Sequence, residues 1–200
     1  MSRIDPIDHL VSALKTPGAK TSDFDLNPGE EPFQPDKLKE AAVLVPVLKA
    51  STGLRVLLTK RSSALKHHPG QIAFPGGRCD AQDRDEVATA LREAEEEIGL
   101  NSDLVQILGR LPAHRTVTGF NVTPIVGHVA NSFRPVPNTD EVSEVFDVPY
   151  RLVTNPDCFS IQWRHWRGKP RYYFTVPYGP YYIWGATARI LRGLAERVAQ

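Results

Sequence analysis

Hydrophobic residues fall into short runs separated by turn-forming segments along most of the 200-residue chain. Runs of this length, rich in valine, leucine, isoleucine and aromatic residues, are typical of β-strands. Pro46 lies within one such run and lacks the amide hydrogen that a sheet needs, which favours an edge strand or a bulge there. Strands are predicted at residues 41–49, 54–61, 103–111, 121–130 and 171–178, and residues 71–77 begin as a strand and end in a glycine turn.

Other segments show the 3.6-residue spacing of amphipathic helices. The clearest is 85–98, where Asp83 or Asp85 can cap the first turn and Gly99 can end the helix in a left-handed conformation. Further helices are predicted within residues 1–20, within 139–149 and at 186–199.

Strands precede, separate and follow these helices, without a repeat or a strict β–α–β alternation. This order predicts an α/β or α+β domain around a mixed sheet. Residues 21–37 are rich in proline, aspartate and glutamate and are predicted to be an extended arm. We therefore expect an N-terminal helix and arm over residues 1–37 and one folded domain over 38–200.

Composition narrows the function classes. The net charge is +1, so the chain as a whole does not attract nucleic acid or an acidic membrane. No apolar run approaches the roughly 20 residues that span a bilayer. Cys79 and Cys158 lie in no metal-ligand pattern, which fits a reducing compartment. A cytoplasmic protein without a nucleic-acid or membrane partner is expected.

Four glutamates crowd residues 93–97 of the predicted helix. Glu93, Glu96 and Glu97 share an arc of about 100°, away from the predicted apolar stripe. Such like-charge pairs cost a helix about 0.2–0.5 kcal/mol each. A hard cation such as Mg²⁺ or Mn²⁺ would turn them into ligands, whereas a solvated acidic face paired with Arg92 is the alternative. The stripe itself comprises Val87, Leu91, Ala94 and Ile98.

A glycine pair, Gly76 and Gly77, closes the segment FPGG just before the acidic helix. The unit resembles the Nudix box, the signature of the Nudix hydrolases, usually written G-x5-E-x7-R-E-U-x-E-E-x-G-U with U aliphatic. Residues 92–100, REAEEEIGL, fit its second half position by position. In the first half the acidic position falls on Asp83, which eight residues instead of seven separate from Arg92, and Glu86 is the alternative occupant.

A second motif lies upstream. Residues 57–77, LLTKRSSALKHHPGQIAFPGG, are similar to the motif LLTxRS-x3-R-x3-G-x3-FPGG of the coenzyme A pyrophosphatase branch of the family. Lys66 stands at the second arginine position, where it keeps the charge and loses the bidentate fork. The longer box also occurs in this branch. The resemblance covers about residues 40–195.

The resemblance implies a Nudix-like α/β/α sandwich with a central mixed β-sheet. It also implies metal-dependent hydrolysis of the diphosphate of coenzyme A or its thioesters, giving 4′-phosphopantetheine, or its acyl form, and 3′,5′-ADP. Hydrolysis of another nucleoside diphosphate, such as ADP-ribose, NADH or a dinucleotide, is the alternative. A non-catalytic nucleotide-sensing domain is a third interpretation.

Site residues follow from the same resemblance. Glu96 and Glu97 are the expected ligands of Mg²⁺ or Mn²⁺, and Glu93 is a third ligand or the general base. Arg92 is expected to hold a helix carboxylate, and Glu141 or Glu144 to assist. The residues expected to contact the substrate are Arg61, Lys66, Gly76 and Gly77. A homodimer formed through the N-terminal arm is a further expectation.

Aromatic and basic residues alternate in IQWRHWRGKPRYYF, residues 161–174. Such a pattern can stack on single-stranded nucleic acid. A strand hairpin that turns at Gly168 and Lys169 is the favoured interpretation.

Overall fold

The secondary structure follows most of the predicted pattern. The computed structural model describes residues 5–30, 37–130, 133–166 and 168–200. The described strands are β1 (Thr21–Ser22), β2 (Lys39–Ala50), β3 (Gly53–Arg61), β4 (Ile72–Ala73), β5 (Gly76–Arg78), β6 (Val105–Arg110), β7 (His114–Arg115), β8 (Phe120–Val129), β9 (Val142–Pro149), β10 (Ser160–Trp166) and β11 (Lys169–Thr175). The helices are α1 (Pro6–Lys15), α2 (Glu86–Ile98), α3 (Tyr150–Val153) and α4 (Gly185–Val198).

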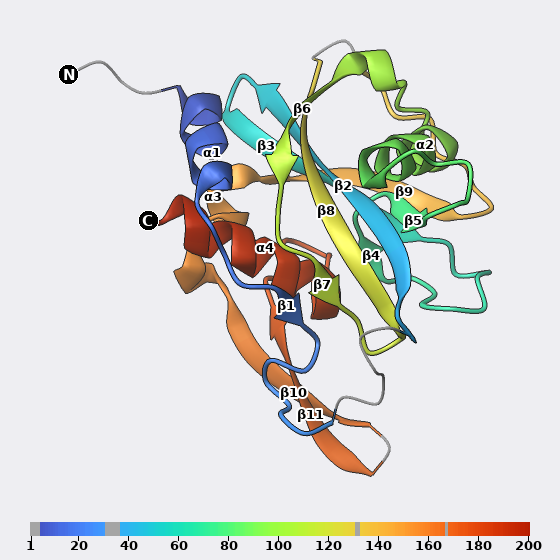
Figure 1. Cartoon of the computed structure of the whole chain (residues 1–200), viewed down its shortest axis with the longest axis vertical. Helices are drawn as coiled ribbons and strands as arrows, with labels where there is room; N and C mark the ends of the chain where they lie inside the picture. The colour runs from blue at the N-terminus through green and yellow to red at the C-terminus, as the bar shows by residue number, and fades with distance from the viewer. Residues whose placement is uncertain (1–4, 31–36, 131–132, 167) are drawn as a thin grey trace.

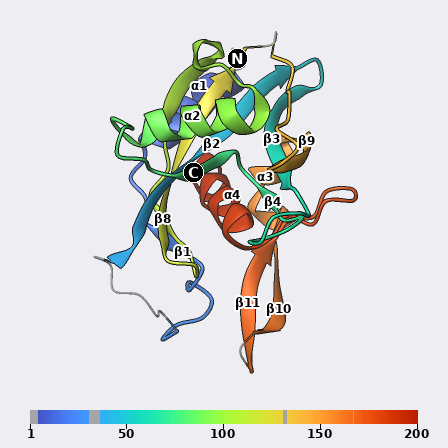
Figure 2. The ribbon, with the colours of Figure 1, turned by 90° about the vertical axis from the view of Figure 1, so that its right-hand side faces the viewer.

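In the described part of the chain, nine strands form one mixed sheet (Figure 1). Its main path runs β1-β7-β8-β2-β3-β4, with β5 beside β2, β6 beside β8 and β9 beside β3. Helix α2 covers one face of the sheet, whereas α1, α3 and α4 pack on the other (Figure 2). The predicted α/β/α sandwich with a central mixed sheet is confirmed.

Strand β2 lies at the centre of the sheet, between β8 and β3. Successive side chains point to opposite faces, so Leu44 packs in the core beneath α2 and Val45 in the core beneath α4. Because both faces are covered, the strand is continuously apolar. The predicted hairpin is confirmed as β10 and β11, although Lys169, predicted in the turn, already belongs to β11 and pairs with Trp166.

The prediction of an edge strand or a bulge at Pro46 is wrong, because β2 is a central strand and its register with β8 is unbroken. Pro46 pairs with Gly127 on β8 on one side. On the other side β2 pairs with β5 as far as Val43 and with β3 only from Val47. The amide of Leu44 points to that side, where it donates to the carbonyl of Pro75. Pro46 faces the same gap, so its missing amide hydrogen leaves no acceptor unpaired.

The helix predicted within residues 139–149 is also wrong, because Val142–Pro149 is strand β9. The residues Val142, Val145 and Phe146 mimic helical spacing. Three β-branched valines in seven residues favour a strand instead, and pairing along β3 supplies the partner that decides the outcome.

The sheet splits beside α2, and this split places the glycine loop. Strands β2 and β3 pair next to their hairpin and then diverge. The segment 72–78 fills the gap, with β4 pairing with β3 and β5 pairing with β2. Gly76 and Gly77 therefore lie between two central strands.

The N-terminal segment packs on the same sheet. Strand β1 pairs with β7 in parallel, and α1 packs against β6 and α4. The fully buried His114 contacts the hydroxyl of Thr21 at 2.9 Å and the carboxylate of Asp23 at 3.3 Å. Part of the predicted arm, residues 31–36, lies outside the described residues. The division at residue 37 and the homodimer stay predictions.

No helix within the described ranges is long and apolar enough to cross a membrane.

Replacing Asp23 by Asn is expected to lower the free energy of unfolding by about 1–2 kcal/mol at pH 7, because a buried charge-assisted hydrogen bond is lost. Burial would raise the pKa of Asp23, but hydrogen bonds from His114 and Val117 outweigh it and hold that pKa below its usual value. The stabilisation is therefore complete above about pH 4 and fades as pH falls through the folded-state pKa.

Urea unfolding of both proteins at pH 7 and pH 3 measures this effect. The difference should shrink at pH 3, and Asp8→Asn, on the exposed side of α1, serves as the control. A difference that does not change with pH contradicts the account.

Candidate active site

Helix α2 begins and ends where the sequence indicates. Asp85 is the N-cap, and its carboxylate accepts a hydrogen bond from the Ala88 amide at 2.8 Å. Gly99 adopts φ 69° at the C-terminus, a left-handed conformation that favours glycine. Of the two predicted caps, Asp85 holds this position and leaves Asp83 for another contact.

The buried face of α2 differs from the predicted stripe. Ala90, Ala94 and Ile98 are fully buried, whereas Val87 and Leu91 are only half-buried. Glu97, expected away from the core, is 4% exposed. The reason is helix geometry, because positions 90, 94 and 97 follow the spacing i, i+4, i+7 on one side of the helix. The small side chains of the two alanines let the helix approach the sheet closely. Glu97 lies on the same side of the helix and is therefore buried with them.

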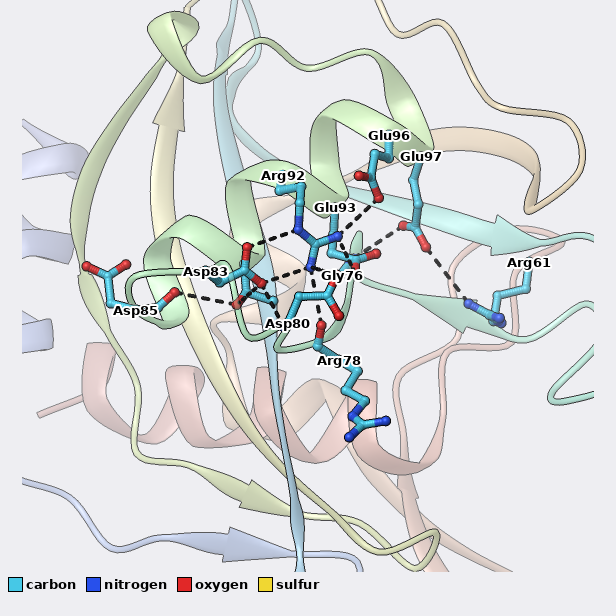
Figure 3. A network of polar contacts seen from close by, with 11 residues as sticks. Arg61, Gly76, Arg78, Asp80, Asp83, Asp85, Arg92, Glu93, Glu96 and Glu97 are labelled. Atoms are coloured by element: carbon cyan, nitrogen blue, oxygen red, sulfur yellow. Dashed lines mark hydrogen bonds and ion pairs between the residues drawn. The ribbon is translucent and has the colours of Figure 1, made fainter.

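Arg92 is the centre of a polar network on α2 (Figure 3). Its Nη1 donates to Glu93 at 2.9 Å and to Glu96 at 3.1 Å. Its Nη2 donates to the backbone carbonyl of Arg78, which follows the glycines, at 3.3 Å. One guanidinium thus positions two glutamates and anchors the glycine loop to the helix.

Asp83 completes this network from the loop before α2. Its carboxylate accepts from Nε of Arg92 at 3.0 Å and from Nη2 at 2.9 Å, a bidentate pair. Thr89 also donates to it, at 2.8 Å. Hydrogen bonding to Arg92, the largest influence, holds the pKa of Asp83 well below its usual range. Of the two candidates for the acidic position of the loop, Asp83 contacts Arg92.

The two glycines leave room that no other residue would leave. A Cβ on Gly77 would lie 2.5 Å from the carboxylate of Glu93. A Cβ on Gly76 would lie 2.4 Å from the backbone carbonyl of Ala42, and Gly76 has φ 153°. The loop backbone therefore lies directly against the strand and the glutamates.

Glu97 is a buried carboxylate with few partners. Oε2 accepts from the Gly76 amide at 3.3 Å, and Oε1 lies 3.9 Å from Nη1 of Arg61. Burial is the largest influence and raises the pKa of Glu97 to about 7. Nε of Arg61 is buried without a hydrogen-bond partner among the described residues. A buried charge is costly unless it is paired, and Arg61 pairs with Glu97 only across this long distance.

Glu93 and Glu141 add further negative charge. Burial raises the pKa of Glu93, although the hydrogen bond from Arg92 opposes it. Glu141 is exposed in the turn before β9, and its charge contributes to the raised pKa of both Glu93 and Glu97. The structure thus brings Glu141 close to the glutamates of α2.

Not every expected site residue joins this group. Lys66 is exposed in the loop between β3 and β4, outside the contacts around Arg92 described above. Glu144 lies on the face of the sheet away from α2, where it accepts a hydrogen bond from the hydroxyl of Tyr181. Asp80, which lies 3.8 Å from Arg92, was not anticipated from the sequence, because no periodicity marks a loop residue.

The donor set fits a hard divalent cation. Glu93, Glu96 and Glu97 supply only carboxylate oxygens, which suit Mg²⁺ or Mn²⁺. The underpartnered carboxylate of Glu97 is where added positive charge relieves the most repulsion. In the described ranges, no three acidic, histidine or cysteine side chains converge as a complete metal site.

Replacing Asp83 by Asn is expected to lower the free energy of unfolding by about 1–2 kcal/mol, because the bidentate bond to Arg92 is lost in a side chain that is 7% exposed. Asp85→Asn is the matched control, since Asn caps a helix as well as Asp. Thermal or urea unfolding measures both variants. Equal effects from the two substitutions contradict a special role for Asp83.

Comparison with known proteins agrees with this geometry. The NUDIX domain model matches residues 38–166. The "uncharacterized Nudix hydrolase NudL" of Pectobacterium atrosepticum is 41% identical over 162 residues, which cover 80% of this chain and 83% of the relative. Its namesake in Klebsiella pneumoniae is 40% identical over 161 residues, with the same shares.

Among solved structures, a MutT/nudix family protein from Enterococcus faecalis aligns with a TM-score of 0.50 at 16% identity. The alignment covers 85% of this chain and 65% of that one, and supports the fold alone. The matched domain and the two relatives show that this chain belongs to the Nudix hydrolase family, whose members act on the pyrophosphate bond of nucleoside diphosphate derivatives.

Proposed function

We propose that this Nudix hydrolase cleaves the diphosphate of coenzyme A or its thioesters, giving 4′-phosphopantetheine, or its acyl form, and 3′,5′-ADP. One contact carries the proposal. Arg61, from the upstream motif, reaches to 3.9 Å from Glu97 of the Nudix box. The two motifs, separated in sequence, therefore belong to one site.

Nudix hydrolases generally use divalent metal ions, and we assign Mg²⁺ or Mn²⁺ to Glu93, Glu96 and Glu97. When bound, the cation neutralises charge on the diphosphate and makes water a better nucleophile. The cation would also stabilise the charged form of Glu97. Without it, the Glu97 carboxylate has only a long contact to Arg61 and one hydrogen bond from a backbone amide.

The remaining side chains position these groups. Arg92 orients Glu93 and Glu96 through Nη1. Two carboxylates are candidates for the general base, namely Glu93, whose pKa is raised by burial, and Glu141, which is exposed nearby. A base with a pKa closer to neutrality transfers protons more effectively at pH 7. Gly76 and Gly77 would let the diphosphate approach the backbone.

The loop between β3 and β4 is the proposed site of the 3′-phosphate of coenzyme A. It carries Lys66, which is exposed and free to turn toward a ligand, and it begins next to Arg61. An ammonium group attracts phosphate as a point charge. Screening limits its reach to about 8–10 Å, so the small net charge of the chain does not oppose this local attraction.

A different nucleoside diphosphate substrate is the second candidate, and a nucleotide-sensing domain is the third. The exposed Lys66 favours the second, because within the described residues no hydrogen bond or ion pair holds its side chain in place. The glutamates count against the third, since Arg92 and Gly76 hold them as an organised group. A sensing domain does not need to retain them.

Product analysis tests the proposed substrate. The protein is incubated with Mg²⁺ or Mn²⁺ and, separately, coenzyme A, ADP-ribose, NADH and a dinucleoside polyphosphate, and the products are separated by chromatography. Metal-dependent release of 3′,5′-ADP from coenzyme A is expected. Cleavage of another substrate without cleavage of coenzyme A would overturn the proposed substrate but would still agree with hydrolysis of a nucleoside diphosphate derivative.

Replacing Glu96 and Glu97 together by Gln is expected to lower kcat by about 10²-fold or more, because charge stabilisation at the reacting group is lost. The fold should persist, since Gln has the shape of Glu and its amide oxygen can still accept the hydrogen bond from the Gly76 amide. Glu95→Gln, on the exposed side of α2, is the control. Undiminished turnover by the double variant, measured beside its thermal unfolding, contradicts the assignment.

Replacing Lys66 by Ala is expected to raise KM for coenzyme A about tenfold, the result of losing one charged contact of about 1.4 kcal/mol. The KM for dephospho-coenzyme A should not change, because that substrate lacks the 3′-phosphate. Lys49→Ala, at the far end of β2, is the matched control. Equal increases in the KM of both substrates would contradict the proposal that this loop binds the 3′-phosphate.

A further inference from the structure

A cavity of about 300 Å³ opens on the face of the sheet opposite α2. Its floor is formed by Lys60 of β3, Ile72 of β4 and Glu144 of β9. Its cover comes from the segment between β11 and α4, which lies beside β4 in Figure 2 and supplies Tyr181, Tyr182 and Trp184. No role assigned above uses these three rings.

Contacts around Tyr181 make this side of the cavity rigid. The ring of Tyr181 stacks on Phe146 with a centroid distance of 3.6 Å and an interplanar angle of 6°. Its hydroxyl donates to Oε1 of Glu144. Both the ring and the carboxylate are therefore positioned before a ligand arrives, and among the described residues Oε2 of Glu144 has no hydrogen-bond partner that a ligand must displace.

The other side is formed by Trp184 and Tyr182. The guanidinium of Arg164 lies 4.3 Å from the Trp184 ring, and Tyr173 packs edge-on against the same ring at 5.1 Å. The hydroxyl groups of Tyr173 and Tyr182 are 3.3 Å apart. Tyr182 is nevertheless 46% exposed, so a broad aromatic surface stays available.

The cavity and the acidic site share one end of the β3–β9 pair. Lys60 is the register partner of Glu144, and the next residue, Arg61, is the partner of Val142. Consecutive side chains point to opposite faces, so Lys60 faces the cavity while Arg61 faces Glu97. A ligand that passes over this end of the sheet would meet both sites.

We propose that the cavity is the subsite for the adenine base of the nucleotide, an inference that rests on the proposed function. Three features match this base. The volume of the cavity lies at the lower end of the range for ligand pockets, which suits a base and part of its ribose. Aromatic faces stack on flat bases. Glu144 only accepts hydrogen bonds, so it pairs with the exocyclic amine of adenine and repels the O6 atom of hypoxanthine.

Equilibrium binding without metal tests the subsite independently of turnover. Calorimetry compares 3′,5′-ADP with inosine 3′,5′-bisphosphate, in which a carbonyl replaces the exocyclic amine and N1 carries a proton. The wild type should bind the adenine form about tenfold more tightly, as expected for one hydrogen bond to a charged group. Glu144→Gln should bring the ratio near one, because a carboxamide can donate as well as accept. Asp147→Asn, an exposed carboxylate on the same strand, should keep the wild-type ratio.

Tyr182→Ala separates stacking from base readout. It should weaken both nucleotides by a similar factor and leave their ratio unchanged. Equal binding of the two nucleotides by the wild type, or an unchanged ratio in Glu144→Gln, overturns the proposal. Tighter binding of 4′-phosphopantetheine that Tyr182→Ala abolishes also overturns it, because the cavity would then hold the other half of coenzyme A.

The two proposals fail in distinguishable ways. If the protein discriminates between the two bases but does not hydrolyse coenzyme A, the adenine subsite is supported and coenzyme A is excluded as the substrate. If the protein hydrolyses coenzyme A but binds the two bases equally, the proposed substrate is supported and the adenine subsite is excluded.

Discussion

A carboxylate buried in the interior must find positive charge or remain protonated, and Glu97 is in that position. It is 4% exposed, has one backbone donor and lies 3.9 Å from Arg61. Its pKa of about 7, raised chiefly by burial, reflects this shortage of partners. The fold retains it at the junction of the acidic helix, the glycine loop and β3. A divalent cation bound to Glu97 would resolve the conflict and would connect these elements chemically.

The split in the sheet makes this junction. If β2 and β3 stayed paired along their full length, the glycine segment would have no place between them, and no backbone amide would reach Glu97. On the N-terminal side of Val47, β2 separates from β3 and leaves room for β4 and β5. Gly76, which has no side chain, then lies directly against Ala42. Arg92 and Asp83 fix the loop from the helix side through a bidentate pair. Packing and electrostatics thus select the same loop conformation.

The sequence predicted the sandwich, most strands and the glutamate group, because periodicity and the Nudix box are local signals. It misassigned Val142–Pro149, whose helical spacing was overridden by pairing with β3. It also placed Glu97 away from the core, although the spacing of Ala90, Ala94 and Glu97 carried the correct signal. The cavity around Glu144 depends on long-range packing, which no local pattern reveals.

The most direct test is a crystal structure of the protein with Mn²⁺, using anomalous scattering to locate the metal. We expect a peak within bonding distance of Glu97 and at least one of Glu93 and Glu96. Such a peak would show that the buried carboxylate is a metal ligand. Mn²⁺ bound only elsewhere, or no peak at millimolar Mn²⁺ with Glu97 still beside Arg61 and Gly76, would contradict the account.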